Sequence, residues 1–94
     1  MLIRSQDKMS LVKFENIVVN INNINGKEII CWSQMNPGED EYISLGYYST
    51  KAKAMKVLDM IQEAYCKFMS VKNDDAWDGK EAVFQMPEDG SVEV

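Results

Sequence analysis

The sequence predicts an α+β domain in which an antiparallel meander of four to five strands packs on one long helix in the C-terminal half, followed by a short final strand. Two observations lead to this prediction. Up to residue 48, short apolar runs alternate with polar residues and are separated by turn residues, as is typical of half-buried strands. From residue 51 to about residue 70 there is neither glycine nor proline, and apolar residues recur at helical spacing.

The length of 94 residues fits a single domain. We expect this domain to span residues 1–87 and residues 88–94 to form an acidic, frayed tail. A domain of this size buries a limited share of its surface, so association with a partner is one route to stability.

The first two strands are expected at residues 2–6 and 11–14, because Asp7 and Lys8 between them suit a tight reversal. A third strand is expected over residues 15–22, where apolar residues occupy every second position. These strands should each turn one face to the core.

The dipeptide Asn25-Gly26 follows the third strand and is the strongest hairpin signal in the chain. A two-residue type I′ turn needs positive φ at both central positions, which asparagine and glycine tolerate. The partner strand is expected over residues 27–35, and a further strand over residues 42–48. The core-facing residues of that further strand are predicted to be Ile43, Leu45 and Tyr47.

The helix is expected to begin after Ser49 or Thr50, since a short hydroxyl side chain there can accept a hydrogen bond from a first-turn N–H. Its apolar residues form one broad stripe that should lie on the sheet. The stripe consists of Ala54, Val57, Leu58, Ile61, Ala64, Tyr65 and Phe68. A last strand is expected over residues 82–86, before Pro87.

Composition excludes several classes of function. Fifteen acidic residues against ten basic ones give a net charge of -5, which opposes general binding to nucleic acid backbones. The chain has no histidine and its two cysteines lie far apart, so we expect no metal site, no cofactor and no enzymatic activity. The N-terminus lacks the apolar core of a signal peptide and no run has membrane-spanning length, so we expect a cytoplasmic protein.

Three residues are candidates for binding an anionic ligand. Thr50 and Lys53 lie in the first turn of the predicted helix, where backbone N–H groups and the helix dipole attract phosphate. Arg4 is the single arginine and suits bidentate phosphate contact. The alternative interpretation is simple helix capping beside solvated lysines, with Arg4 in an intramolecular ion pair.

Four residues are candidates for a protein interface. Met55, Cys66 and Met69 lie to one side of the helix stripe, and Trp32 falls on the sheet face opposite to Cys31. This is more apolar surface than a two-layer monomer can bury, so we expect self-association as a dimer or a higher oligomer.

The string Leu45-Gly46-Tyr47-Tyr48-Ser49-Thr50, followed by Ala54 and Val57, is similar to the strand-to-helix junction of plant ethylene-response-type and phage-integrase arm-binding domains. This resemblance covers about a third of the chain and implies three antiparallel strands packed on one helix. Those domains read DNA with arginine and tryptophan on their strands. The predicted sheet of this chain offers few basic residues for that purpose, namely Arg4, Lys13 and Lys27.

Nearly the whole chain resembles a family of small Firmicute phage and prophage proteins. This resemblance implies an origin and a site in the bacterial cytoplasm, and it implies no activity. The strings that carry it are Leu2-Ile3-Arg4-Ser5-Gln6-Asp7-Lys8, Glu15-Asn16-Ile17, Leu45-Gly46-x-Tyr48-Ser49-Thr50, Val57-Leu58-x-x-Ile61-Gln62-x-Ala64-Tyr65 and Gln85-Met86-Pro87.

We therefore expect a non-enzymatic phage or prophage accessory protein that binds a host component or a small molecule. The leading hypothesis is evasion of host defence by sequestering an anionic, cyclic nucleotide second messenger. The alternatives are a DNA-binding accessory factor and an acidic nucleic-acid mimic that inhibits a host defence protein. The acidic surface of such a mimic would be built from Glu39, Asp40, Glu41, Asp74, Asp75 and Asp78.

Overall fold

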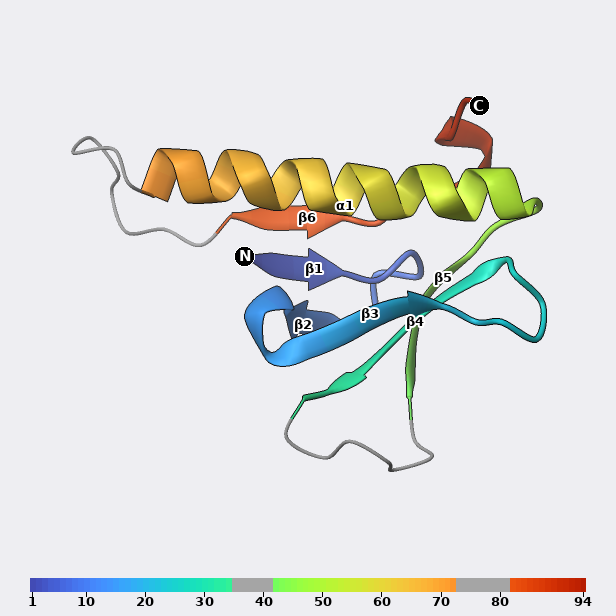
Figure 1. The fold of residues 1–94 in the computed structure, drawn as a ribbon, viewed down its shortest axis with the longest axis horizontal. Coiled ribbons are helices and arrows are strands. Elements are labelled where there is room, and N and C mark those ends of the chain that lie inside the picture. The colour runs from blue at the N-terminus through green and yellow to red at the C-terminus, as the bar shows by residue number, and fades with distance from the viewer. Residues whose placement is uncertain (35–41, 73–81) are drawn as a thin grey trace.

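The computed structural model describes residues 1–34, 42–72 and 82–94 of the chain. It confirms the predicted α+β class, with strands before and after one long helix (Figure 1). The elements are β1 (Leu2–Arg4), β2 (Leu11–Lys13), η1 (Phe14–Asn16), β3 (Ile17–Ile21), β4 (Glu28–Ser33), β5 (Ile43–Tyr47), α1 (Lys51–Lys72), β6 (Val83–Gln85) and η2 (Asp89–Ser91), where η marks a 3-10 turn.

The strands form two three-stranded sheets, whereas the sequence predicted a single meander. Sheet A has the order β2-β1-β6 and sheet B the order β3-β4-β5. The turn η1 separates them, and its Glu15 carboxylate accepts hydrogen bonds of 2.7 and 2.9 Å from the amino group of Met1. The reversal predicted at Asp7 and Lys8 is confirmed, with β1 and β2 antiparallel and Lys8 at a φ of 67°.

The final strand β6 pairs in parallel with β1, because the chain crosses from sheet B along α1 before it reaches sheet A. Figure 1 shows α1 lying along one side of both sheets, roughly in line with β1 and β6. The ends of the chain are therefore joined in one sheet, although more than 75 residues separate the paired strands in the sequence.

The hydrophobic core lies between α1 and the inner faces of the two sheets. The predicted helix stripe is confirmed, since Ala54, Val57, Ile61 and Phe68 are buried and its other members are partly buried. Each 100 Å² of apolar surface removed from water contributes about 2.5 kcal/mol. The sheets complete this core with Met1, Ile3, Ile29, Cys31, Leu45, Tyr48 and Met86.

The hairpin at Asn25-Gly26 is confirmed, but its predicted type I′ turn is wrong. Gly26 has a φ of 69°, whereas Asn25 is not among the residues with positive φ. The loop is longer than two residues, because Asn22 and Glu28 are the last bonded pair and Gly26 donates its N–H to the carbonyl of Asn22. The side chain of Asn25 instead accepts hydrogen bonds from the N–H groups of Lys27 and Glu28.

The predicted common face of Ile43, Leu45 and Tyr47 is also wrong. A register shift between β4 and β5 pairs Ile30 with Ser44 but Ile29 with Gly46, so Leu45 is the extra residue of a bulge. Leu45 is buried, while Tyr47 lies opposite Glu28 on the outer face and is exposed. The bulge therefore interrupts the alternation of inward and outward side chains along β5.

The expectation of a frayed tail at residues 88–94 is wrong. Val92 is buried in the core, and the Asp89 carboxylate accepts a hydrogen bond from the N–H of Ser49 at 2.6 Å. The tail thereby covers the beginning of α1, where Thr50 accepts a hydrogen bond of 3.1 Å from the N–H of Lys53 as the predicted cap.

Candidate interaction surface

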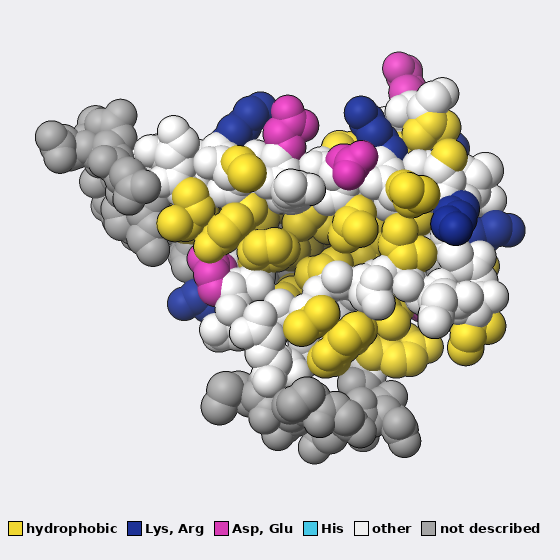
Figure 2. Space-filling view, viewed as in Figure 1, with side chains coloured by type: hydrophobic (Ala, Val, Ile, Leu, Met, Phe, Trp, Pro, Cys, Tyr) yellow, Lys and Arg dark blue, Asp and Glu magenta, His cyan; other side chains and the backbone are white. Residues whose placement is uncertain are grey.

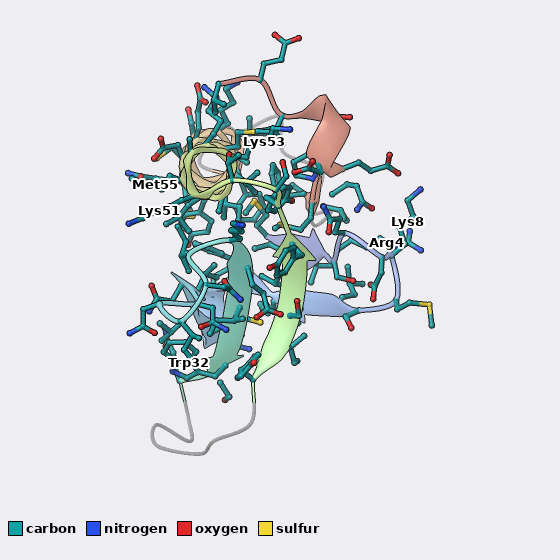
Figure 3. The ribbon with its side chains drawn as sticks, turned by 90° about the vertical axis from the view of Figure 1, so that its right-hand side faces the viewer. Arg4, Lys8, Trp32, Lys51, Lys53 and Met55 are labelled. Carbon is teal, nitrogen blue, oxygen red and sulfur yellow. The ribbon has the colours of Figure 1, made fainter. Side chains whose placement is uncertain are left out.

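The residues predicted to bind an anion do not converge in one pocket. The Arg4 side chain lies on β1 and its Nε donates to the carbonyl of Lys8 at 3.2 Å. Lys53 lies at the start of α1, and Figure 3 shows it well apart from Arg4 and Lys8. Its Nζ donates to the carbonyl of Asp89 at 3.0 Å and pairs with the Asp89 carboxylate at 3.4 Å.

The beginning of α1 is thus already satisfied by the chain itself. The Thr50 hydroxyl caps the first turn, and Asp89 supplies the negative charge that would otherwise come from a ligand. The hydrogen bond from the Ser49 N–H, although partial burial opposes it, holds the pKa of Asp89 below its usual range. This geometry matches the capping interpretation of the sequence.

Among the described residues, a groove runs between α1 and β3, and it is here called the α1–β3 groove. It consists of two neighbouring cavities of about 270 and 360 Å³, which meet at Leu58. The helix lines it with Met55, Leu58, Ile61, Gln62, Tyr65 and Cys66. The strand side lines it with Phe14, Ile17, Val19 and Ile21. The polar residues that line it include Asn23, Lys51, Asp59 and Gln62.

The walls of the groove are apolar and fixed. The rings of Phe14 and Tyr65 pack with their centroids 4.7 Å apart, which joins η1 to α1 at one end of the groove. Figure 2 shows hydrophobic side chains gathered in a band below the helix and again lower on the same broad face. A surface of this kind is suited to contact with another apolar surface.

The predicted interface residues gather on this broad face. Met55 and Cys66 line the α1–β3 groove, and Met69 continues their side of the helix. Met55 and Met69 are 52% and 36% exposed, so both methionines present apolar surface to solvent. Figure 3 places Trp32 of β4 on the same side of the molecule as Met55, opposite to Arg4 and Lys8.

The two edges of sheet B differ. The edge at β5 is covered by Gln6, whose backbone N–H donates a hydrogen bond to the carbonyl of Leu45. The side-chain amide of Gln6 also accepts a hydrogen bond of 2.9 Å from the N–H of Tyr47 and donates one of 3.1 Å to the carbonyl of Tyr47. At β3, the Asn22–Glu28 and Gln34–Asn16 hydrogen bonds show that even-numbered residues bond to β4. The odd-numbered residues therefore direct their backbone groups to the outer edge.

That outer edge of β3 is partly blocked. The N–H of Ile17 donates to Phe14 within η1, and the N–H of Ile21 donates to the side chain of Asn20. Among the described residues, nothing pairs with the outward backbone groups of Val19. A single open position does not support addition of a strand, so the groove beside β3 is the interaction feature of this region.

Sequence reasoning missed the strand side of the groove. Ile17, Val19 and Ile21 were expected on one face of a half-buried strand and Phe14 at the end of the strand before it, but none of them was expected to line a groove; all four are partly buried. The signal that could have found them is the stripe of Met55, Cys66 and Met69, since exposed apolar residues beside a core stripe require an apolar neighbour. The acidic residues of the predicted nucleic-acid mimic lie outside the described residues.

Comparison with known proteins adds no relative: no family model, no curated protein and no solved structure matches the chain. Within the parts of the chain that the structure describes, no three histidine, cysteine or acidic side chains are grouped to hold a metal ion. Among the described residues, no helix combines the length and the apolar character that crossing a membrane requires.

Proposed function

We propose that this chain is a non-enzymatic binding protein and that its working surface is the broad face with the α1–β3 groove. The observation that supports the proposal is the groove itself, in which apolar side chains from η1, β3 and α1 line two neighbouring cavities that share Leu58. Monomeric proteins rarely leave a large contiguous apolar patch in contact with water. A partner that covers this face removes that unfavourable contact.

The partner that we propose for this face is a second copy of the chain. Trp32 of β4 and Met55 of α1 lie on this one side of the molecule, and Cys66 of α1 lines the groove there with Met55. A standard interface buries about 800 Å² per partner, which is roughly half of the 44 × 34 Å outline of the face. Two copies related by a two-fold axis would cover the same patch on each other.

Light scattering on the purified protein tests the proposed association. We expect a particle of twice the 10.8 kDa chain mass at tens of micromolar, with dissociation on dilution. A constant mass of one chain across this range would contradict the proposal. Higher oligomers would indicate a second contact surface in addition to this face.

The proposed biological role is that of a phage or prophage accessory protein acting in the bacterial cytoplasm on a host component. Its support is the resemblance of the sequence strings to Firmicute phage proteins, together with a compact fold that offers a binding face. Pull-down from a bacterial host lysate with the wild-type dimer and with an Asp74→Asn, Asp75→Asn variant tests this role. Loss of a specific host protein only with the variant would support the acidic mimic.

Sequestration of an anionic cyclic nucleotide is a separate ligand hypothesis within the same role. A thermal shift series with cyclic dinucleotides and cyclic ADP-ribose isomers tests it. If such a ligand binds through Arg4, the Arg4→Ala variant should keep its melting temperature within a few degrees and lose the ligand-induced shift, because an exposed arginine adds little stability. No shift for the wild-type protein would remove this ligand class.

A further inference from the structure

We infer that the second copy packs antiparallel on α1, with the two-fold axis at Gln62, so that α1 of each copy covers the α1–β3 groove of the other. This inference rests on the proposed self-association and adds its geometry. It is drawn from the spacing of the side chains along α1 and from the cavities that they line.

The apolar residues on the groove side of α1, of which Leu58 is partly buried and Met55, Cys66 and Met69 are exposed, are spaced symmetrically about Gln62. Met55 and Met69 each lie seven residues from Gln62, and Leu58 and Cys66 each lie four residues from it. Seven residues are almost two helical turns, so Met55, Gln62 and Met69 share one side of α1. In an antiparallel pair centred on Gln62, Met55 therefore faces Met69 of the second copy, and Leu58 faces Cys66 of the second copy.

The residue at the centre suits a two-fold axis. A glutamine side chain carries both a donor and an acceptor, so two Gln62 amides can bond each other across the axis without an unpaired group. Gln62 is exposed and lines the α1–β3 groove, where its other neighbours are apolar. A polar residue at the middle of an apolar seam is a common device that fixes the register of paired helices.

In an alternative dimer, with the two-fold axis away from Gln62, α1 of one copy would pack on Trp32 and the outer face of sheet B of the other copy. The helix stripe has an internal symmetry that this arrangement does not use, because Met55 and Met69 would then meet different surfaces. We therefore favour the helix-to-helix contact. The two arrangements place the residues of α1 at different distances from their symmetry mates, which disulfide trapping measures.

The test is disulfide trapping of the full chain in a Cys66→Ser background, where Cys31 is buried and inert. A Gln62→Cys variant should form a covalent dimer under mild oxidation, since the two introduced thiols meet on the axis. The matched control is Lys67→Cys, which is exposed on another side of α1 and should cross-link at least tenfold more slowly. Non-reducing electrophoresis at fixed protein concentration compares the two rates.

A second pair of variants checks the register. Leu58→Cys with the native Cys66 should cross-link readily, because these positions face each other across the axis. Leu58→Cys with Cys66→Ser should not, since its two thiols would lie about 12 Å apart along the helix. Equal cross-linking of the two variants would overturn the register.

The result also separates this inference from the proposed function. A wild-type dimer by light scattering whose Gln62→Cys variant cross-links no faster than Lys67→Cys would overturn the helix pairing and leave self-association standing. A wild-type monomer would overturn both. Rapid and selective cross-linking of Gln62→Cys, with the register pattern above, supports both.

Discussion

The carboxylate of Asp89 accepts a hydrogen bond of 2.6 Å from the backbone N–H of Ser49, forty residues earlier in the chain. The same side chain pairs with Lys53 in the first turn of α1. This contact closes the helix N-terminus with an internal negative charge and anchors the C-terminal segment on the fold. It also occupies the position at which the sequence predicts a phosphate.

Removal of this contact should destabilise the fold. We expect Asp89→Ala to lower the melting temperature at pH 7 by about 2–5 °C, because the Ser49 N–H loses its acceptor and Lys53 loses its carboxylate partner while it keeps the carbonyl of residue 89. The neighbouring Glu88→Ala is the matched control, since Glu88 is exposed, and should change the melting temperature by less than about 1 °C. Equal effects of both substitutions would show that the tail does not dock through Asp89.

The Asp89 effect should depend on pH in a defined direction. Its pKa in the folded protein lies below the ordinary value of 3.8, first because the Ser49 N–H bonds the charged form. A lowered folded pKa stabilises the fold above the unfolded pKa, and this stabilisation is lost as pH falls through the folded pKa. The difference between the melting temperatures of wild type and Asp89→Ala should therefore be full above about pH 5 and shrink as the pH falls through the folded-state pKa, which lies below 3.8.

The core side and the exposed side of α1 can be separated by adjacent substitutions. Ile61 is 1% exposed, so Ile61→Asp buries an unpaired carboxylate at a cost of several kcal/mol and should prevent folding. Gln62 is exposed, and Gln62→Asp should melt cooperatively. Circular dichroism melts measure both. A cooperatively melting Ile61→Asp protein would show that this side of α1 does not face the core.

The two cysteines should differ in reactivity by orders of magnitude. Burial raises the pKa of the Cys31 thiol to about 11, so only about one molecule in a thousand is ionised there at pH 8. Cys66 is exposed on α1 and should react with a thiol reagent at once when the protein is dilute. At tens of micromolar, the proposed second copy should slow the labelling of Cys66, with a Cys66→Ser variant as the blank.

Local patterns in the sequence predicted those parts of the fold that depend on neighbours in the chain. The cap at Thr50 and the core stripe through Ile61 follow from helix geometry alone, and both are confirmed. The alternation of Ile17, Val19 and Ile21 likewise predicted the partly buried side of β3. Each of these features requires only the period of one element.

Features that depend on pairing between distant segments could not be predicted. The bulge at Leu45 is set by the register of β4 against β5, and it reverses the face on which Tyr47 lies. The parallel pairing of β6 with β1 and the docking of Asp89 are contacts between opposite ends of the chain. The α1–β3 groove also depends on contacts between distant segments, because its two walls come from elements whose distance in space cannot be read from the sequence.

The central claim is that the α1–β3 face associates with a second copy, and sedimentation equilibrium of three proteins tests it most directly. Wild type is compared with Met55→Glu and with Val71→Glu. Met55 and Val71 are 52% and 55% exposed on the same helix and lie about 160° apart around it, so the two substitutions are closely matched.

We predict that wild type and Val71→Glu sediment as dimers with similar dissociation constants. Met55→Glu should raise the dissociation constant by about a hundredfold, because it places a carboxylate in the apolar contact of each copy. Equal dissociation constants for all three proteins, or a wild-type monomer at tens of micromolar, would contradict the claim.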